Sequence, residues 1–138
     1  MAKNVKISCR QTKDYELLKK LDRRAFPIDA LRDFQSDVCW LIKYNNDIVG
    51  YFSLEIINNN TAFLSRVGIF KHGCGLHRRA INVRIRWCKK HNIKKIITYA
   101  HMNNFQSIVN LIRCGFRLYI EPDQHQREKF LHFIKTLQ

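Results

Sequence analysis

The sequence predicts an α/β fold with a mixed, mostly antiparallel sheet of about six or seven strands flanked by helices. Three observations support this prediction. Strand-like runs joined by asparagine-rich turns fill residues 38–70, helical apolar spacing begins at residue 76, and strand and helix patterns then alternate. A length of 138 residues and a hydrophobic content of 46% suit one domain, residues 1–138, with its own core.

Periodicity and turn residues place the expected elements. In chain order they are a strand at 5–8, a helix at 12–25 with Thr12 as N-cap, a further helical turn at 30–34, strands at 38–44, 48–57 and 61–70, a helix at 76–91, a strand at 94–100, a helix at 104–114 stopped by Gly115, and closing strands at 116–121 and 129–137 around Pro122-Asp123. One buried stripe is predicted on the helix 76–91, from residues spaced by four, three and four: Leu76, Ala80, Val83 and Trp87. Trp40 and Trp87 are both expected in the core.

The composition argues against several classes of protein. No apolar run approaches the roughly 20 residues that span a bilayer, and a secretory signal is not expected at the N-terminus. The five cysteines are an odd number without CxxC spacing, which argues against a disulfide framework and against a zinc site. We therefore expect a cytoplasmic protein with no metal and no membrane partner.

Positive charge is concentrated in the second half of the chain. The formal net charge is +14: residues 71–138 hold fourteen lysines and arginines against three acids, or +11, and residues 1–70 hold eleven against eight, or +3. The segment 71–95 carries nine of these cations and no acid. Five polar residues share one face of the predicted helix: Arg79, Asn82, Arg86, Lys89 and Lys90. The segment is a candidate surface for nucleic acid or another acidic partner; the alternative is a basic surface without a partner.

A strand, a glycine-containing loop and a helix follow one another from residue 61 to residue 91. The loop reads Lys71-His72-Gly73-Cys74-Gly75, and the helix after it points unpaired backbone N–H groups and its positive end toward the loop. Such an arrangement commonly binds phosphate. Taken alone, the two glycines favour an ordinary strand-to-helix turn over a phosphate site.

Several further motifs resemble those of the GNAT (N-acetyltransferase) superfamily. The stretch from Val67 to His77 resembles the family pattern of a strand followed by Arg/Gln-x-x-Gly-x-Gly/Ala. Asn104-Phe105-Gln106-Ser107, followed by Gly115-Phe116, resembles the second family element. Ala25-Phe26-Pro27 after the first helix and Asp47-Ile48-Val49-Gly50 at a hairpin are similar to family motifs as well. The resemblance covers nearly the whole chain in the family's order.

The resemblance implies a donor, acetyl-coenzyme A, and a set of residues that bind it. Main-chain groups around Val67 and Ile69 would pair with the pantetheine arm, and Asn104 and Ser107 would meet it from the second helix. The pyrophosphate would be held by backbone N–H groups of six consecutive residues: His72, Gly73, Cys74, Gly75, Leu76 and His77. An amine would then attack the thioester directly, with a backbone N–H of the strand 61–70 polarising the carbonyl.

The sequence departs from the family pattern at residues that bear on catalysis. His72 stands where Arg or Gln is usual. His77 stands where Gly or Ala is usual, and it would crowd the cofactor, donate a hydrogen bond to phosphate, or tilt away at the surface. Leu111 occupies the place where many relatives carry a tyrosine that protonates the leaving thiolate. Either Tyr99, Tyr119 or solvent would supply that proton instead, or turnover would be slow.

Glu55 is the acid placed nearest the expected cleft, and it is the candidate general base. The alternative for this residue is an exposed strand position paired with Lys or Arg. A water chain to bulk solvent would also serve as the base.

We expect residues 26–34 and the closing strands to form the acceptor side. The favoured function is acetyl transfer to a primary amine; the alternatives are an enzyme acting on DNA or RNA, and a catalytically weakened coenzyme A-binding module.

Overall fold

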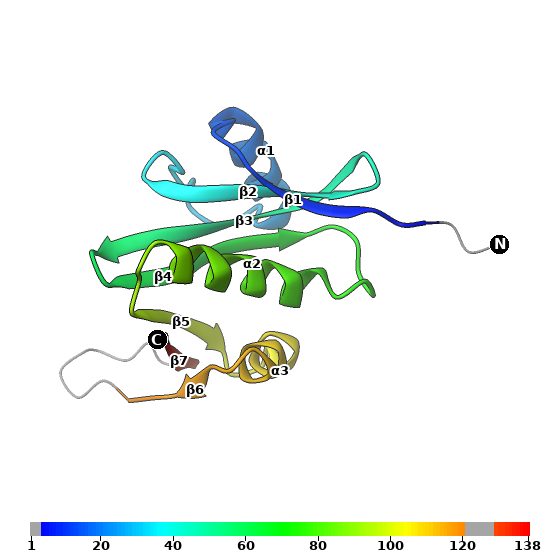
Figure 1. The fold of residues 1–138 in the computed structure, drawn as a ribbon. Coiled ribbons are helices and arrows are strands. Elements are labelled where there is room, and N and C mark those ends of the chain that lie inside the picture. The colour runs from blue at the N-terminus through cyan, green and yellow to red at the C-terminus, as the bar shows by residue number, and fades with distance from the viewer. Residues whose placement is uncertain (1–3, 121–128) are drawn as a thin grey trace. The chain divides into compact units, whose positions relative to one another are not determined.

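The computed structural model describes residues 4–120 and 129–138 (Figure 1). The chain divides into two compact units. Unit 1 comprises Met1–Glu55 and Ser65–Leu76, and unit 2 comprises Ile56–Leu64 and His77–Gln138. The division falls within strands β3 and β4, so each of these strands contributes residues to both units.

Unit 1 is built on antiparallel strands and one helix. The elements in chain order are β1 (Ile7–Gln11), α1 (Tyr15–Ala25), β2 (Asp37–Tyr44), β3 (Asp47–Asn58) and β4 (Thr61–Ile69). β1 pairs antiparallel with β2, and β2 pairs antiparallel with β3. Buried residues from α1, the α1–β2 connection and these strands form its core: Leu18, Phe34, Cys39 and Tyr51.

Unit 2 combines the start of β4 with two helices and three further strands. These are α2 (Leu76–Lys90), β5 (Lys95–His101), α3 (Phe105–Arg113), β6 (Arg117–Leu118) and β7 (Phe130–Thr136). β4 pairs parallel with β5, whereas β5 with β7 and β6 with β7 are antiparallel. The predicted fold class, mixed and mostly antiparallel with about six or seven strands, is confirmed.

Buried residues alternate along β5 and so identify the two faces of the unit 2 sheet. Ile96, Thr98 and Ala100 are buried, whereas Ile97, Tyr99 and His101 between them are half-buried. Successive side chains of a strand point to opposite faces. The half-buried face therefore carries Tyr99, and its partner across the β5–β7 ladder is His132.

Several predicted boundaries shift in the structure. The first helix begins at Tyr15, and its N-cap is Asp14 rather than Thr12, because the Asp14 carboxylate accepts from the backbone N–H of Leu17. Thr12 instead accepts from the backbone N–H of Asp14 across 3.0 Å. The first strand lies at Ile7–Gln11 rather than at 5–8, and residues 30–34 form no helical turn.

The predicted turn at Asn45 and the predicted helix stop at Gly115 are confirmed. Asn45 separates β2 from β3 with a φ of +57°, a left-handed conformation that asparagine tolerates well. Gly115, with a φ of +92°, directly follows the C-cap of α3. β6 is limited to Arg117–Leu118 among the described residues, and the predicted Glu121 and Pro122-Asp123 lie outside them.

The predicted buried face of α2 is partly wrong. Leu76 and Ala80 are buried as expected, but Val83 and Trp87 are only half-buried, whereas Trp40 is confirmed in the core. The buried stripe continues instead through four other residues: Ile81, Arg84, Ile85 and Cys88. The buried side of α2 is therefore rotated about the helix axis from the predicted one and includes Arg84. The charge of this residue had indicated an exposed face in the sequence.

Three features of the described residues bear on the class of protein. None of the described helices is long and apolar enough to cross a membrane. Over residues 4–120 and 129–138, no group of three or more His, Cys, Asp or Glu side chains is arranged to hold a metal ion. All five cysteines are free thiols.

Candidate active site

The loop before α2 has the backbone conformation that its glycines predict. Gly73 has a φ of +82° and Gly75 a φ of +68°, both in the left-handed region. Apart from the glycine and its two chain neighbours, no heavy atom of the described residues lies within 4 Å of where a Cβ would stand at either position. The requirement for glycine is therefore conformational, and the loop is open on the sides that these two residues face.

The loop leads directly into the N-terminus of α2, which begins at Leu76. The first turn contains no acidic residue, and Leu76 is buried. The first N–H groups of an α-helix have no intrahelical acceptor and carry the positive end of the helix dipole. Of the loop residues before the helix, His72, Gly73 and Gly75 are exposed to solvent.

His77, in the first turn of α2, is held by the second helix of unit 2. Its Nδ1 lies 3.1 Å from the side-chain amide nitrogen of Asn110 on α3. Because that nitrogen only donates, Nδ1 accepts and the proton of the neutral imidazole resides on Nε2. His77 is therefore not a histidine tilted into solvent.

Burial keeps the His77 imidazole neutral. It lowers the pKa of His77 to about 4, and the nearby positive charge of Arg84 contributes in the same direction. Arg84 is itself fully buried and donates from Nε to the Ala80 carbonyl across 3.0 Å. Burial lowers the pKa of the Arg84 guanidinium to about 9, so it stays charged at neutral pH. At that pH His77 offers one N–H donor and no positive charge.

Asn104 and Ser107 meet at the start of α3. The Asn104 side-chain oxygen accepts from the Ser107 backbone N–H across 3.2 Å, which makes Asn104 the N-cap of the helix. Capping by itself accounts for an asparagine at this position. The motif that resembles the family's second element therefore has a structural role within unit 2.

Within unit 2, the parallel pairing of β4 with β5 is short. It joins Thr61, Ala62 and Phe63 to residues 95–97. At the next position the Thr98 hydroxyl donates to the Leu64 carbonyl across 3.1 Å. In a longer parallel ladder, a backbone N–H would donate to this carbonyl instead. Val67 and Ile69 lie further along β4, are half-buried, and belong to unit 1.

In unit 1, a charged cluster on α1, β3 and β4 was missed by sequence reasoning. Arg66 Nε lies 3.4 Å from the buried Asp22 carboxylate, and its Nη1 lies 3.0 Å from Asp29. The Arg66 guanidinium also covers the Phe26 ring at 4.5 Å. The Tyr51 hydroxyl donates to the same Asp22 oxygen, and burial together with this bond raises the pKa of Tyr51.

This cluster fixes the start of the segment expected on the acceptor side. Arg66 contacts residues at both ends of the turn from Phe26 to Asp29, where α1 gives way to irregular chain. Gly68 brings β4 close to Tyr51, since a Cβ at Gly68 would stand 2.3 Å from the Tyr51 ring. The sequence signal was Arg66 as the single charged residue of the strand-like run 61–70.

The candidate base Glu55 has a cationic neighbour. Its carboxylate lies 3.9 Å from Arg32 Nη2, and its side chain is 44% exposed. Arg32 also forms a closer pair with Asp37, at 2.9 Å. The geometry of Glu55 matches the alternative that the sequence left open, a strand carboxylate paired with arginine.

The two candidate tyrosines lie in unit 2, on either side of one histidine. The ring centroid of His132 is 6.0 Å from that of Tyr99 and 6.3 Å from that of Tyr119. Phe130 packs edge-on against Tyr99, at 5.2 Å. Nε2 of His132 is buried and has no hydrogen-bond partner among the described residues. Leu111 is buried on α3 and has no proton to give.

His132 was missed by sequence reasoning, although the strand pattern held a signal. In Phe130–Thr136, alternate side chains share a face, which places His132 with Phe130 and Ile134. The β5–β7 register then sets His132 opposite Tyr99. Without that register, the histidine could not be related to either tyrosine.

Comparison with known proteins finds the family that the sequence motifs resemble. A model of the acetyltransferase (GNAT) family matches residues 8–116. No curated protein matches the chain. Among solved structures, an IAA acetyltransferase from Bacillus cereus is 12% identical with a TM-score of 0.78, covering 96% of this chain and 100% of that one.

Two other similar structures include coenzyme A compounds. One is a GNAT family acetyltransferase from Elizabethkingia anophelis with acetyl-CoA bound: 18% identity, TM-score 0.76, covering 99% of this chain and 100% of that one. The other is Arabidopsis thaliana Naa50 in complex with the bisubstrate analogue CoA-Ac-MVNAL: 19% identity, TM-score 0.76, covering 95% and 99%. The family match covers most of the sequence and these structures share the fold, so the chain belongs to the acetyltransferase (GNAT) family.

Proposed function

We propose that this protein transfers the acetyl group of acetyl-CoA to a primary amine by direct attack. The observation that carries the proposal is the loop of Gly73 and Gly75, which opens α2 with two left-handed glycines and no acid in the first turn. Family membership supports an acetyl-CoA donor. The acetyl-CoA in the Elizabethkingia structure and the bisubstrate analogue in the Arabidopsis structure support the same donor.

Backbone groups of the loop and of β4 would bind most of the donor. The amides of residues 72–77 would hold the pyrophosphate, and His77 would add its Nε2 proton. Main-chain groups at Val67 and Ile69 would pair with the pantetheine arm, as a peptide adds to a strand edge. Asn104 and Ser107 remain assigned to that arm as well.

In the proposed reaction the neutral amine attacks the thioester carbonyl carbon. A backbone N–H of β4 stabilises the negative charge that develops on the carbonyl oxygen. When the intermediate collapses, the carbon–sulfur bond breaks and the thiolate takes a proton. Tyr119 is the proposed donor of that proton, since Leu111 cannot provide one. The extra proton on the attacking nitrogen of the tetrahedral intermediate passes to water, or to Glu55 if the Arg32 pair opens, and water returns a proton to Tyr119 after the thiolate has left.

The two units are proposed to act as one acetyltransferase domain. The family model supports this, since residues 8–116 include parts of both units. On the acceptor side, the segment 26–34 would be set by the Arg66 cluster, which holds Phe26 and Asp29. In unit 2, the closing strands, with Tyr99 and His132 on the half-buried face of β5 and β7, remain the other segment proposed to serve the acceptor.

Two measurements test this proposal. Acetyl-CoA at a hundred times its dissociation constant should stabilise the protein by about 2.7 kcal/mol, a rise of several degrees in melting temperature. Thiol release in the presence of a panel of primary amines, including peptides with a free N-terminus, should then identify an acceptor. The proposal fails if no melting shift occurs at millimolar acetyl-CoA, or if binding occurs and no amine is acetylated.

A further inference from the structure

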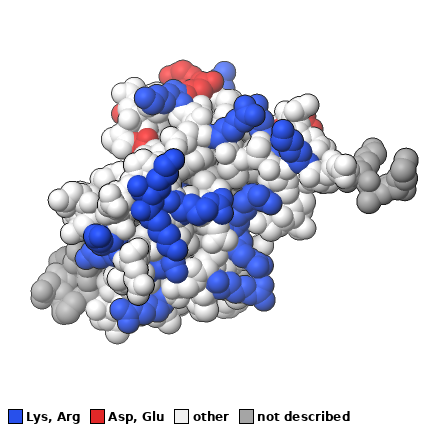
Figure 2. Space-filling model, in the orientation of Figure 1, with Lys and Arg blue, Asp and Glu red and all other residues white. Residues whose placement is uncertain are grey.

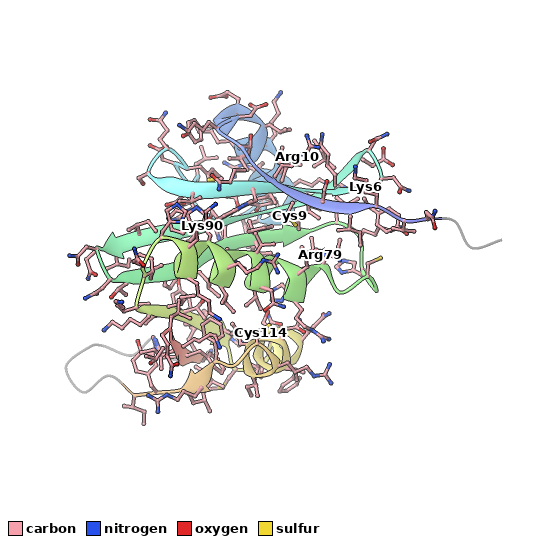
Figure 3. The ribbon with its side chains drawn as sticks, viewed as in Figure 1. Lys6, Cys9, Arg10, Arg79, Lys90 and Cys114 are labelled. Carbon is pink, nitrogen blue, oxygen red and sulfur yellow. The ribbon has the colours of Figure 1, made fainter. Side chains whose placement is uncertain are left out.

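The exposed side of α2 carries a dense group of cations. The described residues of unit 2 contain twelve lysines and arginines and no aspartate or glutamate. On α2 itself, five of these cations are exposed: Arg78, Arg79, Arg86, Lys89 and Lys90. Figure 2 shows Lys and Arg atoms gathered over α2, and Figure 3 marks Arg79 and Lys90 near opposite ends of the helix.

Three of these cations form one stripe along the helix. Arg79, Arg86 and Lys90 are separated by seven and four residues, which places them on the same side over about 16 Å. Exposed helix faces usually mix charges of both signs at i,i+4 spacing, and such pairs offset repulsion. This stripe has no acidic neighbour on its own helix, so an external polyanion would relieve its repulsion.

An aromatic stack lies at the C-terminal end of the same helix. The rings of Trp87 and His91 are parallel within 13°, with centroids 3.8 Å apart. His91 is exposed, and its Nδ1 lies 2.8 Å from the Trp87 carbonyl, which fixes the ring in place. The stack therefore adds a flat, oriented ring surface next to Lys90.

The composition of α2 distinguishes between classes of polyanion. No large apolar side chain of α2 is exposed, whereas Phe105, Val109 and Ile112 are exposed on α3. A helix that binds a membrane surface needs an apolar face to insert. An acidic protein would use the cations but has no need of a fixed ring. Cations together with a stacking ring suit single-stranded nucleic acid, which offers phosphates and bases at once.

We infer that single-stranded nucleic acid binds along the exposed side of α2. Its phosphates contact Arg79, Arg86 and Lys90, and one base stacks on the outer face of His91. This binding is independent of acetyl transfer, because it uses neither the glycine loop nor the tyrosines. Failure of one therefore leaves the other standing.

The test is fluorescence anisotropy with a labelled 20-nucleotide thymidine strand and the full-length protein. With three phosphates contacted, affinity should fall roughly 20-fold between 50 and 200 mM salt. The variant R79E/R86E/K90E should remove most of the binding. Its matched control is K6E/K13E/K20E, which changes net charge equally at exposed positions of unit 1 and should bind far more tightly than the α2 variant.

A second variant separates stacking from charge. His91→Ala should weaken thymidine-strand binding roughly fivefold or more, and it should leave binding of an abasic strand of the same length unchanged. His72→Ala, an exposed histidine outside α2, serves as its control. Melting temperatures of all variants establish that they are folded.

Three results would overturn the inference. One is equal affinity of the two triple variants for the thymidine strand. The second is equal affinity of the wild-type protein for the thymidine and abasic strands. The third is equally effective competition by polyglutamate of matched charge or by anionic vesicles, which would assign the surface to a different partner.

Discussion

The side-chain amide of Asn110 donates to Nδ1 of His77 across 3.1 Å and joins α3 to the first turn of α2. Because this nitrogen of the imidazole accepts, protonation of Nδ1 would break the bond. Burial and the charge of Arg84 oppose that protonation and hold the pKa of His77 at about 4. Folding of unit 2 therefore favours the neutral imidazole.

Stability should consequently fall on acidification between pH 6.5 and pH 4. In this window the unfolded chain binds a proton at residue 77 that the folded protein does not bind. The free energy of unfolding therefore decreases as the pH falls. Above pH 6.5 the imidazole is neutral in both the folded and the unfolded state, so His77 causes no loss of stability. Below pH 4 it is protonated in both states, so the loss no longer grows. The loss should be about 3 kcal/mol, measured by urea unfolding at several pH values.

Substitution by glutamine isolates this contribution. His77→Gln can still accept from Asn110 but cannot be protonated, so its free energy of unfolding should vary less over the same window. His72→Gln, which changes an exposed loop histidine, should keep the wild-type pH dependence. Parallel curves for wild type and His77→Gln would contradict the assignment.

Gly75→Val should weaken acetyl-CoA binding by at least tenfold, a loss of about 1.4 kcal/mol. A β-branched residue strongly disfavours a φ of +68°, so the loop would adopt another conformation and its amides would turn. Isothermal titration calorimetry measures the change. The control is Asn92→Val, which introduces the same strain at a φ of +60° after the other end of α2. Equal affinity losses in both variants would indicate a general effect on the helix.

Asp22→Ala should destabilise the protein by about 3 kcal/mol, because it leaves the Tyr51 hydroxyl and the Arg66 guanidinium without their shared buried acceptor. Asp29→Ala removes a contact of the same guanidinium whose carboxylate is 47% exposed, and it should cost less than about 1 kcal/mol. Urea unfolding at neutral pH compares the two variants. Similar losses would show that Asp22 is not the centre of the cluster.

Tyr119→Phe should lower kcat about 100-fold, with little change in KM, if Tyr119 protonates the thiolate. Steady-state thiol release measures both constants. Tyr99→Phe is the comparison, because Tyr99 packs against the same histidine without being the proposed donor. A larger effect of Tyr99→Phe would transfer the role to that residue, and no effect of either would assign protonation to solvent.

The sequence was most informative where a local rule decides the structure. Left-handed glycines, the asparagine turns and the strand–helix alternation follow from backbone preferences of the residues themselves, and the structure confirms them at Gly75, Asn45 and Gly115. The rotation of α2 was mispredicted for a different reason. From the sequence, Arg84 was counted among the surface cations. Only the packing of α2 in the folded protein shows that this arginine lies on the buried side of the helix.

The candidate site shows the same limit. The cofactor loop was predictable because consecutive residues form it, whereas the Asp22–Tyr51–Arg66 cluster joins α1, β3 and β4. His132 and Tyr99 come together only through the β5–β7 register. Contacts between distant segments depend on strand pairing, which residue spacing does not specify.

The charge of unit 2 also has a consequence for the protein in dilute buffer. Twelve cations share its described residues with no carboxylate side chain, so compaction brings like charges together at every step. Simple salts would surround them with an ionic atmosphere, and resistance to unfolding should therefore increase as sodium chloride is added. Storage at low ionic strength would be the condition under which this protein is most fragile.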